Sequence, residues 1–427
     1  MKVAFCTLGC KVNQYESQSM EQALIKRGFE CVGASEEADV YIVNSCTVTA
    51  ESDRKTRQNV RHLKKLHPDA VIVLTGCMPQ AFPEDARLLT QADIVTGNRS
   101  NKQIPDMIDE FFRTHERIVR IAQHENGEKF SGELINDFRE RTRATVKIED
   151  GCNRFCSYCV IPYARGRVRS KPLEDIREEI ASLEKKGFSE IVLVGINLSA
   201  YGTDCGASIC DAVELAASFD GIKRVRLGSL EPDHMTPEVT KRLAECKKLC
   251  PQFHISLQSG CDKTLKRMNR HYTAAEYEEL CTRLRSEFED ATLTTDVMVG
   301  FSGETKEDFE ISRDFVRKIG FEKVHVFPYS RRAGTRAAEF PDVVENAEKE
   351  RRSREMIAAA GEVRHEFLER QIGRTVEVLF EEKLRDGSIQ GYTANYTPVR
   401  IKSGCTHGLR KVKITACGDD WCEGELI

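Results

Sequence analysis

The first third of the chain alternates short apolar runs with amphipathic stretches. The segments between the runs, such as residues 14–28 and 50–66, have helical spacing, and Gly28 is a helix C-cap residue. Runs bounded by small or polar residues are typical of strands in a parallel sheet that helices cover. The runs are residues 3–9, 38–46, 70–77 and 92–98. We therefore predict a parallel α/β sheet domain over residues 1–137.

The same alternation repeats over residues 138–368, where six strand-like segments are separated by helical stretches. Six strand–helix units predict an open or partial (β/α)6 barrel, whose active-site groups lie on loops at the carboxyl ends of the strands. The segments are residues 144–152, 190–197, 224–232, 253–260, 293–301 and 323–330.

The last region, residues 369–427, changes to a β pattern after a charged helix over residues 347–371. Turn sequences at 385–387, 402–404 and 418–420 separate about five strand-like segments. This predicts a small antiparallel β-barrel, similar to oligonucleotide-binding barrels. The whole chain is thus expected to be an α/β protein of three domains, as its length of 427 residues also suggests.

Composition narrows the functional classes. The formal net charge of −4 gives no general attraction to nucleic acid, so such a partner must be met by local positive patches. The sequence contains no apolar run long enough for a membrane span and no signal peptide at its start, so we predict a cytoplasmic protein without membrane association. Its 17 cysteines, in a reducing compartment, indicate metal ligation or redox chemistry where they cluster.

Three cysteines lie within eight residues of "GCNRFCSYC", on the loop after the first strand of the predicted barrel. Their spacing, C-x3-C-x2-C, lets three thiolates hold three corners of an iron–sulfur cluster. A closed zinc site would need a fourth donor from elsewhere. We call this set the first triad: Cys152, Cys156 and Cys159.

Three further cysteines each end an apolar run of the first domain, after a small or polar residue. The carboxyl ends of parallel strands meet at one edge, where ligands bind, so these thiols are expected to converge. Ordinary packing of buried cysteines is the alternative, and it is our interpretation for Cys6 and Cys31. We call the converging set the second triad: Cys10, Cys46 and Cys77. The other cysteines are expected to be structural: Cys205, Cys210, Cys246, Cys250, Cys261, Cys281, Cys405, Cys417 and Cys422.

With these motifs the chain resembles the radical S-adenosylmethionine superfamily and, within it, the methylthiotransferases. The resemblance rests on "TLGCKVNQYES", "NSCTVTAESDRKTRQ", "LTGCMPQ", "GCNRFCSYCVIPYARGRVRS", "LVGINLSAYG", "RLGSLEP", "LQSGCDKTLKRMNRHYT", "DVMVGFSGET" and "YSRRAGTRAA". Two positions depart from the usual pattern: Ser302 replaces a proline, and "HISLQSGC" replaces "HLPLQSGS". Both departures keep the neighbouring glycines and polar residues.

The resemblance implies two 4Fe–4S clusters and S-adenosyl-L-methionine as cofactors. The first triad would hold the cluster that generates a 5′-deoxyadenosyl radical, and the second triad a cluster that carries the transferred sulfur. One S-adenosyl-L-methionine would donate the methyl group and another the radical. The resemblance also implies cofactor contacts by Tyr158, Gly195, Asn197, Glu231, Gln258 and Ser259, although each could equally be an ordinary loop residue. No catalytic residue is assigned.

The stretch "GCKVNQYES" is similar to the branch that acts on N6-threonylcarbamoyladenosine at position 37 of tRNA. The implied reaction adds a methylthio group at C2, with the tRNA anticodon loop, an electron donor and a sulfur source as partners. One alternative is the methylthiolation of another tRNA adenosine derivative or of a ribosomal protein residue. An alternative of a different class is a non-catalytic iron–sulfur sensor that binds RNA, although its cluster would more often be closed by four cysteines.

Two basic stretches, residues 54–65 and 139–171, lie beside cysteine loops and predict contacts to tRNA phosphates. Arg165, Arg167 and Arg169 alternate, so in an extended strand they would form one row facing the RNA; pairing with carboxylates inside the barrel is the alternative. The last domain is nearly neutral, and its expected stacking platforms for bases are Tyr392, Tyr396 and Trp421.

Overall fold

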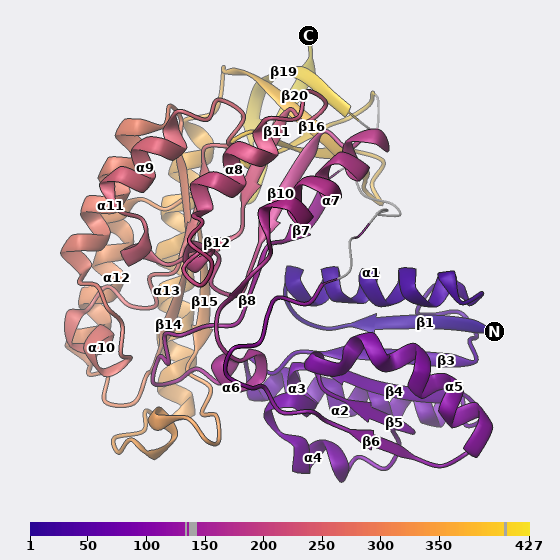
Figure 1. Ribbon diagram of the computed structural model, residues 1–427. Helices are drawn as coiled ribbons and strands as arrows, with labels where there is room; N and C mark the ends of the chain where they lie inside the picture. The colour runs from indigo at the N-terminus through magenta and orange to yellow at the C-terminus, as the bar shows by residue number, and fades with distance from the viewer. Residues whose placement is uncertain (133–134, 136–142, 405–407) are drawn as a thin grey trace.

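The computed structural model describes residues 1–427 except 133–134, 136–142 and 405–407. Its first region is a six-stranded parallel sheet in the order β2-β1-β3-β4-β5-β6, with helices on both faces (Figure 1). The strands are β1 (Lys2–Thr7), β2 (Glu30–Val32), β3 (Val40–Ser45), β4 (Val71–Gly76), β5 (Ile94–Thr96) and β6 (Ile118–Arg120). The helices are α1 (Lys11–Lys26), α2 (Ala50–Leu66), α3 (Cys77–Ala81), α4 (Pro83–Arg87) and α5 (Ile104–Thr114).

Side-chain alternation along these strands builds two apolar layers. Val40 and Ile42 of β3 belong to one buried cluster, whereas Tyr41 and Val43 belong to the cluster on the opposite face. Burial on both faces explains the continuous apolar runs. The four predicted strands and the helix over residues 50–66 are therefore confirmed.

The central region contains two parallel sheets, β11-β10-β7 and β12-β13-β14-β15. The expected strand over 224–232 is interrupted at Gly228, which separates the two sheets. The parallel strands are thus confirmed, while one continuous (β/α)6 barrel stays a prediction. The strands, including the short antiparallel pair β8–β9, are β7 (Arg143–Lys147), β8 (Glu149–Asp150), β9 (Arg169–Ser170), β10 (Glu190–Val194), β11 (Arg224–Leu227), β12 (Ser229–Leu230), β13 (Gln252–Ile255), β14 (Thr292–Val299) and β15 (Lys323–Pro328).

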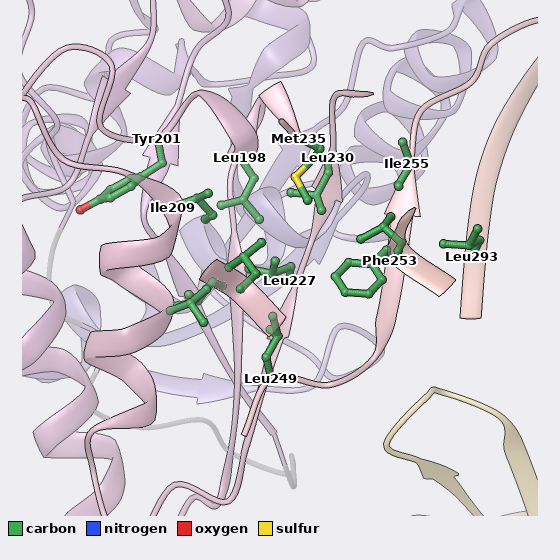
Figure 2. Close-up of a cluster of buried hydrophobic side chains, with 14 of the residues drawn as sticks. Leu198, Tyr201, Ile209, Leu227, Leu230, Met235, Leu249, Phe253, Ile255 and Leu293 are labelled. Carbon is green, nitrogen blue, oxygen red and sulfur yellow. The ribbon is translucent and has the colours of Figure 1, made fainter. Parts of the chain in front are cut away.

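Helices cover the outer face of these sheets, and the largest apolar cluster lies between the two layers (Figure 1). Figure 2 shows part of this cluster, with Leu227 of β11, Phe253 of β13 and Leu293 of β14, and with Leu198 and Met235 of the connecting segments. The helices are α6 (Ile161–Arg165), α7 (Leu173–Lys185), α8 (Ile209–Ala217), α9 (Pro237–Ala244), α10 (Asp262–Arg267), α11 (Ala274–Glu287) and α12 (Lys306–Ile319).

A long helix, α13 (Asn346–Glu369), leads to a closed five-stranded barrel in the order β16-β17-β18-β20-β19. The prediction of an entirely antiparallel barrel needs one correction, because β18 and β20 pair in parallel. β19 runs opposite to β18, and β20 runs opposite to β19, so β20 has the same direction as β18. The strands are β16 (Thr375–Lys383), β17 (Ile389–Thr393), β18 (Pro398–Ile401), β19 (Gly408–Cys417) and β20 (Cys422–Leu426).

The first region and the small barrel lie at opposite ends of the central strands (Figure 1). The first region lies at the carboxyl ends, beside α6, and the small barrel lies at the other end. Arg143 and Arg224, at the start of β7 and β11, form ion pairs with Glu381 and Glu377 of β16. The predicted boundary between residues 137 and 138 lies outside the described residues, so the three-domain division stays a prediction. Among the described helices, none is long and apolar enough to cross a membrane.

Candidate iron–sulfur and cofactor site

The first triad lies on the loop after β8, and backbone contacts fix that loop. Gly151 has a positive φ of 88°, and a Cβ there would lie 1.9 Å from the carbonyl oxygen of Arg167, so glycine is required. The amide of Cys152 donates to the carbonyl of Gly166 (3.0 Å). The amide of Ser157 donates to the carbonyl of Met268 (2.9 Å), which ties the loop to the end of α10.

The three thiols of the first triad are electrostatic neighbours. Burial raises the pKa of Cys152 to about 12, and burial also raises the pKa of Cys159. Negative charge on Cys156 adds to both effects. Arg270 places a positive charge here, because its Nη1 donates to Sγ of Cys156 (3.3 Å).

The second triad is brought together from three strand ends, as predicted. Cys10 follows β1 and is exposed, whereas Cys46, after β3, and Cys77, the first residue of α3, are buried. Gly9 permits this approach: it has φ 114°, and a Cβ there would lie 2.9 Å from Cβ of Cys46. Gly76, with φ 97°, would likewise place a Cβ 2.5 Å from the Ser45 carbonyl oxygen.

Mutual electrostatics show that the second triad converges. Burial raises the pKa of Cys77 to about 12; Arg165 opposes this change, and charge on Cys46 and Cys10 adds to it. Burial also raises the pKa of Cys46, with a contribution from Cys10. Buried thiols of this kind stay protonated until a metal binds the sulfur and displaces the proton.

Each triad offers three thiols, the number that a cubane cluster with one open iron needs. Across the described part of the chain, no three His, Cys, Asp or Glu side chains are grouped tightly enough to hold one ion. A cubane cluster needs a wider set, because each thiolate binds a different iron. Each triad supplies three thiols, which leaves one iron open for another ligand.

Two buried polar atoms beside the first triad fit a polar cofactor. Oε1 of Glu149 and Oδ1 of Asn197 have no hydrogen-bond partner among the described residues. The Asn197 amide donates to Oε2 of Glu149 (2.7 Å), and its Nδ2 lies 3.8 Å from Sγ of Cys152. A side chain at Gly195 would place Cβ 2.5 Å from Oε2 of Glu149. Unsatisfied buried groups beside a thiol are typical of a site that holds a ligand.

Glu231 also lies at this site, where Arg270 forms an ion pair with its carboxylate (2.5 Å). Burial raises the pKa of Glu231 and Arg270 opposes the rise. Sequence reasoning missed Arg270 and Glu149, because only the folded chain brings them to the cysteines. "RMNRHYT" contains Arg270, but no spacing rule marks it.

The remaining predicted cofactor residues have different surroundings. The ring of Tyr158 packs edge-on against Phe301, with centroids 6.3 Å apart. Gln258 has a positive φ of 65°, and its backbone exchanges hydrogen bonds with β14. The Ser259 hydroxyl is buried and accepts a hydrogen bond from the Cys261 amide (3.2 Å), so it supports the local turn.

The predicted row of three arginines is wrong. Residues 161–165 form α6, and Gly166, with φ 72°, redirects the chain, so the extended strand that the alternation assumed is absent. Arg165 and Arg169 are buried and lie near carboxylates, among them Asp150 at 3.6 Å and 3.4 Å. Only Arg167 is exposed, with its guanidinium 4.5 Å from the ring centroid of Phe155. Arg165 and Arg169 therefore pair with carboxylates, as the alternative expected, although Arg165 also pairs with Glu16 of the first region and not only inside the barrel.

The other basic patch is partly neutralised. On α2, Arg54 pairs with Glu51 (2.6 Å) and Lys64 pairs with Asp93 (3.0 Å). Of the basic residues counted in the stretch 139–171, Arg139 and Arg141 lie outside the described residues. The net attraction for phosphates is thus smaller than the sequence alone indicates.

The aromatic residues expected to act as platforms already have partners. The rings of Tyr392 and Tyr396 stack on each other (centroids 4.5 Å apart, 15° between planes), and Arg400 lies 3.6 Å over Trp421. All three aromatic residues line a cavity of about 980 Å³. This cavity extends from Cys10 past Gly195, Gly228, His254 and Asp296 to the small barrel, so all three regions contribute to it.

Comparisons with known proteins agree with this arrangement. The Radical SAM superfamily matches residues 146–316, and Uncharacterized protein family UPF0004 matches residues 2–97. A structure of the radical S-adenosylmethionine methyltransferase TsrM from Kitasatospora setae, with cobalamin and a [4Fe-4S] cluster bound, has a TM-score of 0.56 at 15% identity, covering 80% of this chain and 76% of that chain. This likeness concerns the fold alone. Fold and first triad together define a radical S-adenosylmethionine protein.

Curated relatives match over nearly the full length. The chain is 35% identical to the threonylcarbamoyladenosine tRNA methylthiotransferase MtaB of Bacillus subtilis (strain 168), covering 100% of this chain and 96% of that protein. It is 37% identical to MtaB of Thermotoga maritima, covering 99% and 96%. A tRNA-2-methylthio-N(6)-dimethylallyladenosine synthase of Pelotomaculum thermopropionicum is 36% identical, covering 91% and 88%. The chain therefore belongs to the methylthiotransferase family that includes the threonylcarbamoyladenosine tRNA methylthiotransferases.

Proposed function

We propose that this protein transfers a methylthio group to C2 of N6-threonylcarbamoyladenosine at position 37 of tRNA. Two 4Fe–4S clusters and S-adenosyl-L-methionine are its cofactors. The observation that carries the proposal is the convergence of two separate three-thiol sets in a chain that is similar to MtaB proteins over nearly its full length. A tRNA-modifying enzyme of this kind belongs in the cytoplasm, with an electron donor and a sulfur source as further partners.

In this proposal the first triad holds one cluster, and the residues beside it hold S-adenosyl-L-methionine. When bound, these groups supply the radical and the methyl group, and the second cluster supplies the sulfur. The unpaired oxygens of Glu149 and Asn197 would hold the cofactor by accepting hydrogen bonds from its polar groups. Arg270 holds Glu231 in place and offsets negative charge on Cys156. Tyr158, Gly195, Gln258 and Ser259 shape the remaining walls.

The second triad holds the other cluster at the edge of the first domain, on the side where it meets α6. Cys10 lines the large cavity, whereas Cys46 and Cys77 are buried. A cluster held by these three thiols would therefore be accessible from the cavity on the side of Cys10. The cavity gives a base that is splayed out of its stack a path toward Cys10 of the second triad and toward Gly195, which lies beside Glu149. An anticodon-loop base is suited to this path, because splaying it out costs less than unstacking a base in a duplex.

The small barrel and the exposed Arg167 are the proposed RNA contacts. Tyr392, Tyr396 and Trp421 carry arginine partners, so a base that stacks there meets a cationic aromatic surface. Arg167 lies on the loop that contains the first triad, where a phosphate flanking the target base would be within its reach. We also propose the division into residues 1–137, 138–368 and 369–427, with the central region as a partial (β/α)6 barrel.

One alternative substrate has support of its own. A relative named for N(6)-dimethylallyladenosine is 36% identical, so overall identity does not separate the two substrates. The lining of the cavity favours the threonylcarbamoyl group: Arg226, Lys323 and Arg400 are cations that suit its carboxylate, and Thr294 can bond its hydroxyl. No observation favours a ribosomal protein residue or a non-catalytic sensor.

The test uses the anaerobically reconstituted full-length protein with S-adenosyl-L-methionine, a reductant and three tRNAs. The tRNAs differ only at position 37, which is unmodified adenosine, the threonylcarbamoyl derivative or the dimethylallyl derivative. Mass spectrometry of digested nucleosides should show the methylthio product from the threonylcarbamoyl tRNA. The control, with all three cysteines of the first triad changed to alanine, should give neither that product nor 5′-deoxyadenosine. Product only from the dimethylallyl tRNA would overturn the substrate assignment, and 5′-deoxyadenosine from the control would overturn the cluster assignment.

A further inference from the structure

Arg165 connects the two triads, although it belongs to neither. It lies at the end of α6, six residues after Cys159, so it comes from the loop of the first triad. Its side chain is fully buried and reaches the first region, where Nε donates to Sγ of Cys77 (3.2 Å). One short segment thus carries the thiols of one triad and a cation for a thiol of the other.

The contacts of Arg165 extend over more than one thiol of the second triad. Its Nη2 donates to Oδ1 of Asn13 (3.2 Å), and the same oxygen accepts from Sγ of Cys10 (3.3 Å). Its positive charge also acts on Cys46. A single guanidinium therefore influences all three thiols of the second triad: Cys77 by a direct hydrogen bond, Cys10 through the shared acceptor Asn13, and Cys46 by its charge.

Carboxylates hold the guanidinium in this position. Both oxygens of Glu16 accept from Arg165, through Nη1 and Nη2, and Asp150 lies 3.6 Å away. Lys147 bridges Glu16 and Asp150, at 2.8 Å and 2.7 Å, so the buried charges balance locally. With its other nitrogens satisfied by Glu16 and Asn13, the Nε hydrogen bond to sulfur is a directed contact.

We infer that Arg165 is a positioning residue that stabilises the thiolate ligands of the second cluster and raises its reduction potential. Hydrogen bonds and positive charge at cluster sulfurs favour the reduced, more negative state of the cluster. The inference rests on the proposed function for the identity of the second cluster. It adds a physical link between the two metal sites that neither triad provides by itself.

The test isolates the second cluster in the full-length variant whose first-triad cysteines are all alanine. Iron content and the midpoint potential of the remaining cluster, followed by electron paramagnetic resonance, are compared with and without Arg165→Gln. The potential should shift to more negative values in Arg165→Gln, and Arg165→Lys should recover part of the shift. The matched control is Arg167→Gln, two residues away and exposed, which should leave the potential unchanged.

A second variant separates the sulfur contact from the buried charge. Arg165→Gln alone leaves Glu16 without its arginine partner, so folding can be impaired. The double change Glu16→Gln with Arg165→Gln removes both charges and should still show a negative shift, smaller than that of Arg165→Gln alone because losing the Glu16 charge partly offsets it. Glu16→Gln alone keeps the contact with Cys77 and should show no negative shift.

The outcomes separate this inference from the proposed function. About four irons in the background variant, as expected for one 4Fe–4S cluster, with a potential that does not change in either Arg165→Gln protein, would overturn the role of Arg165 and leave the two-cluster proposal intact. Loss of all iron in the background variant would overturn the second cluster itself, and this inference with it.

Discussion

A buried ion pair between Arg332 and Asp53 should contribute much of the attachment of the first region to the core. Nη2 of Arg332, on the segment after β15, lies 2.5 Å from Oδ2 of Asp53 in α2 and 2.8 Å from Oγ1 of Thr47. The two charged side chains are only 5% and 9% exposed. Thr47 follows Cys46 directly, so the pair also fixes the loop that carries a thiol of the second triad.

The expected cost of Asp53→Ala is about 3–5 kcal/mol in the free energy of unfolding, the usual range for removing one partner of a buried pair. The buried Arg332 would not easily find a new partner for its charge, because its Nε already lacks a hydrogen-bond partner among the described residues. Set against a total stability of about 5–15 kcal/mol, this is a large fraction. Asp53→Asn, which keeps the oxygen that accepts from Thr47, should cost less.

The assay is urea denaturation followed by circular dichroism, with limited proteolysis to locate the region that opens first. The matched control is Glu51→Ala, two residues away in the same helix. Its pair with Arg54 is exposed on both sides, so solvent screens it and its loss should cost far less than the loss of Asp53. If Asp53→Ala and Glu51→Ala had equal effects, the argument from burial would be refuted.

Three further predictions concern the second triad, the RNA contact and pH. Alanine at any cysteine of the second triad should abolish methylthiolated tRNA, because the sulfur-bearing cluster is lost, and leave formation of 5′-deoxyadenosine largely intact; unchanged product in all three variants would contradict a second cluster. Arg167→Gln should weaken tRNA binding and lower its salt slope by about one phosphate contact, measured by titration at several salt concentrations; an unchanged slope would exclude that contact. Hydrogen bonds from Arg351 and Arg352 lower the pKa of Glu348 to about 2, so its stabilising effect should be present near pH 7 and disappear as pH falls from about 4 toward 2. Thermal unfolding of wild type and Glu348→Gln across that range would show it, and a constant difference would count against it.

Local patterns were sufficient to predict most of the strands and the grouping of the second triad at one sheet edge, while the binding of clusters by either triad stays a prediction. Each thiol of the second triad follows a strongly apolar run, and strand ends meet at one sheet edge, so grouping them required no tertiary information. The same rule does not reach Arg165, Arg270 or Glu149, whose partners are distant in sequence. Their roles depend on how loops from different regions meet.

The error over the arginine row has an identifiable cause. The interpretation treated 165–169 as extended because the arginines alternate, but the start of α6 contains Pro162, a residue well suited to the first turn of a helix, and Gly166 ends it. The parallel pairing of β18 with β20 could not be foreseen either, because the direction of pairing depends on barrel closure and not on alternation.

The position of Arg165 in the chain has a consequence for biogenesis. During synthesis the N-terminal part of the chain leaves the ribosome first, and an N-terminal domain can fold before later regions emerge. All three cysteines of the second triad leave the ribosome before Cys152, yet the cation that contacts Cys77 follows only after another 88 residues. A nascent first domain therefore exposes its thiols without their arginine. Metal loaded at that stage would bind the three thiols without the positive charge of Arg165. Once α6 has been translated, Arg165 can reach Cys77 and supply that charge.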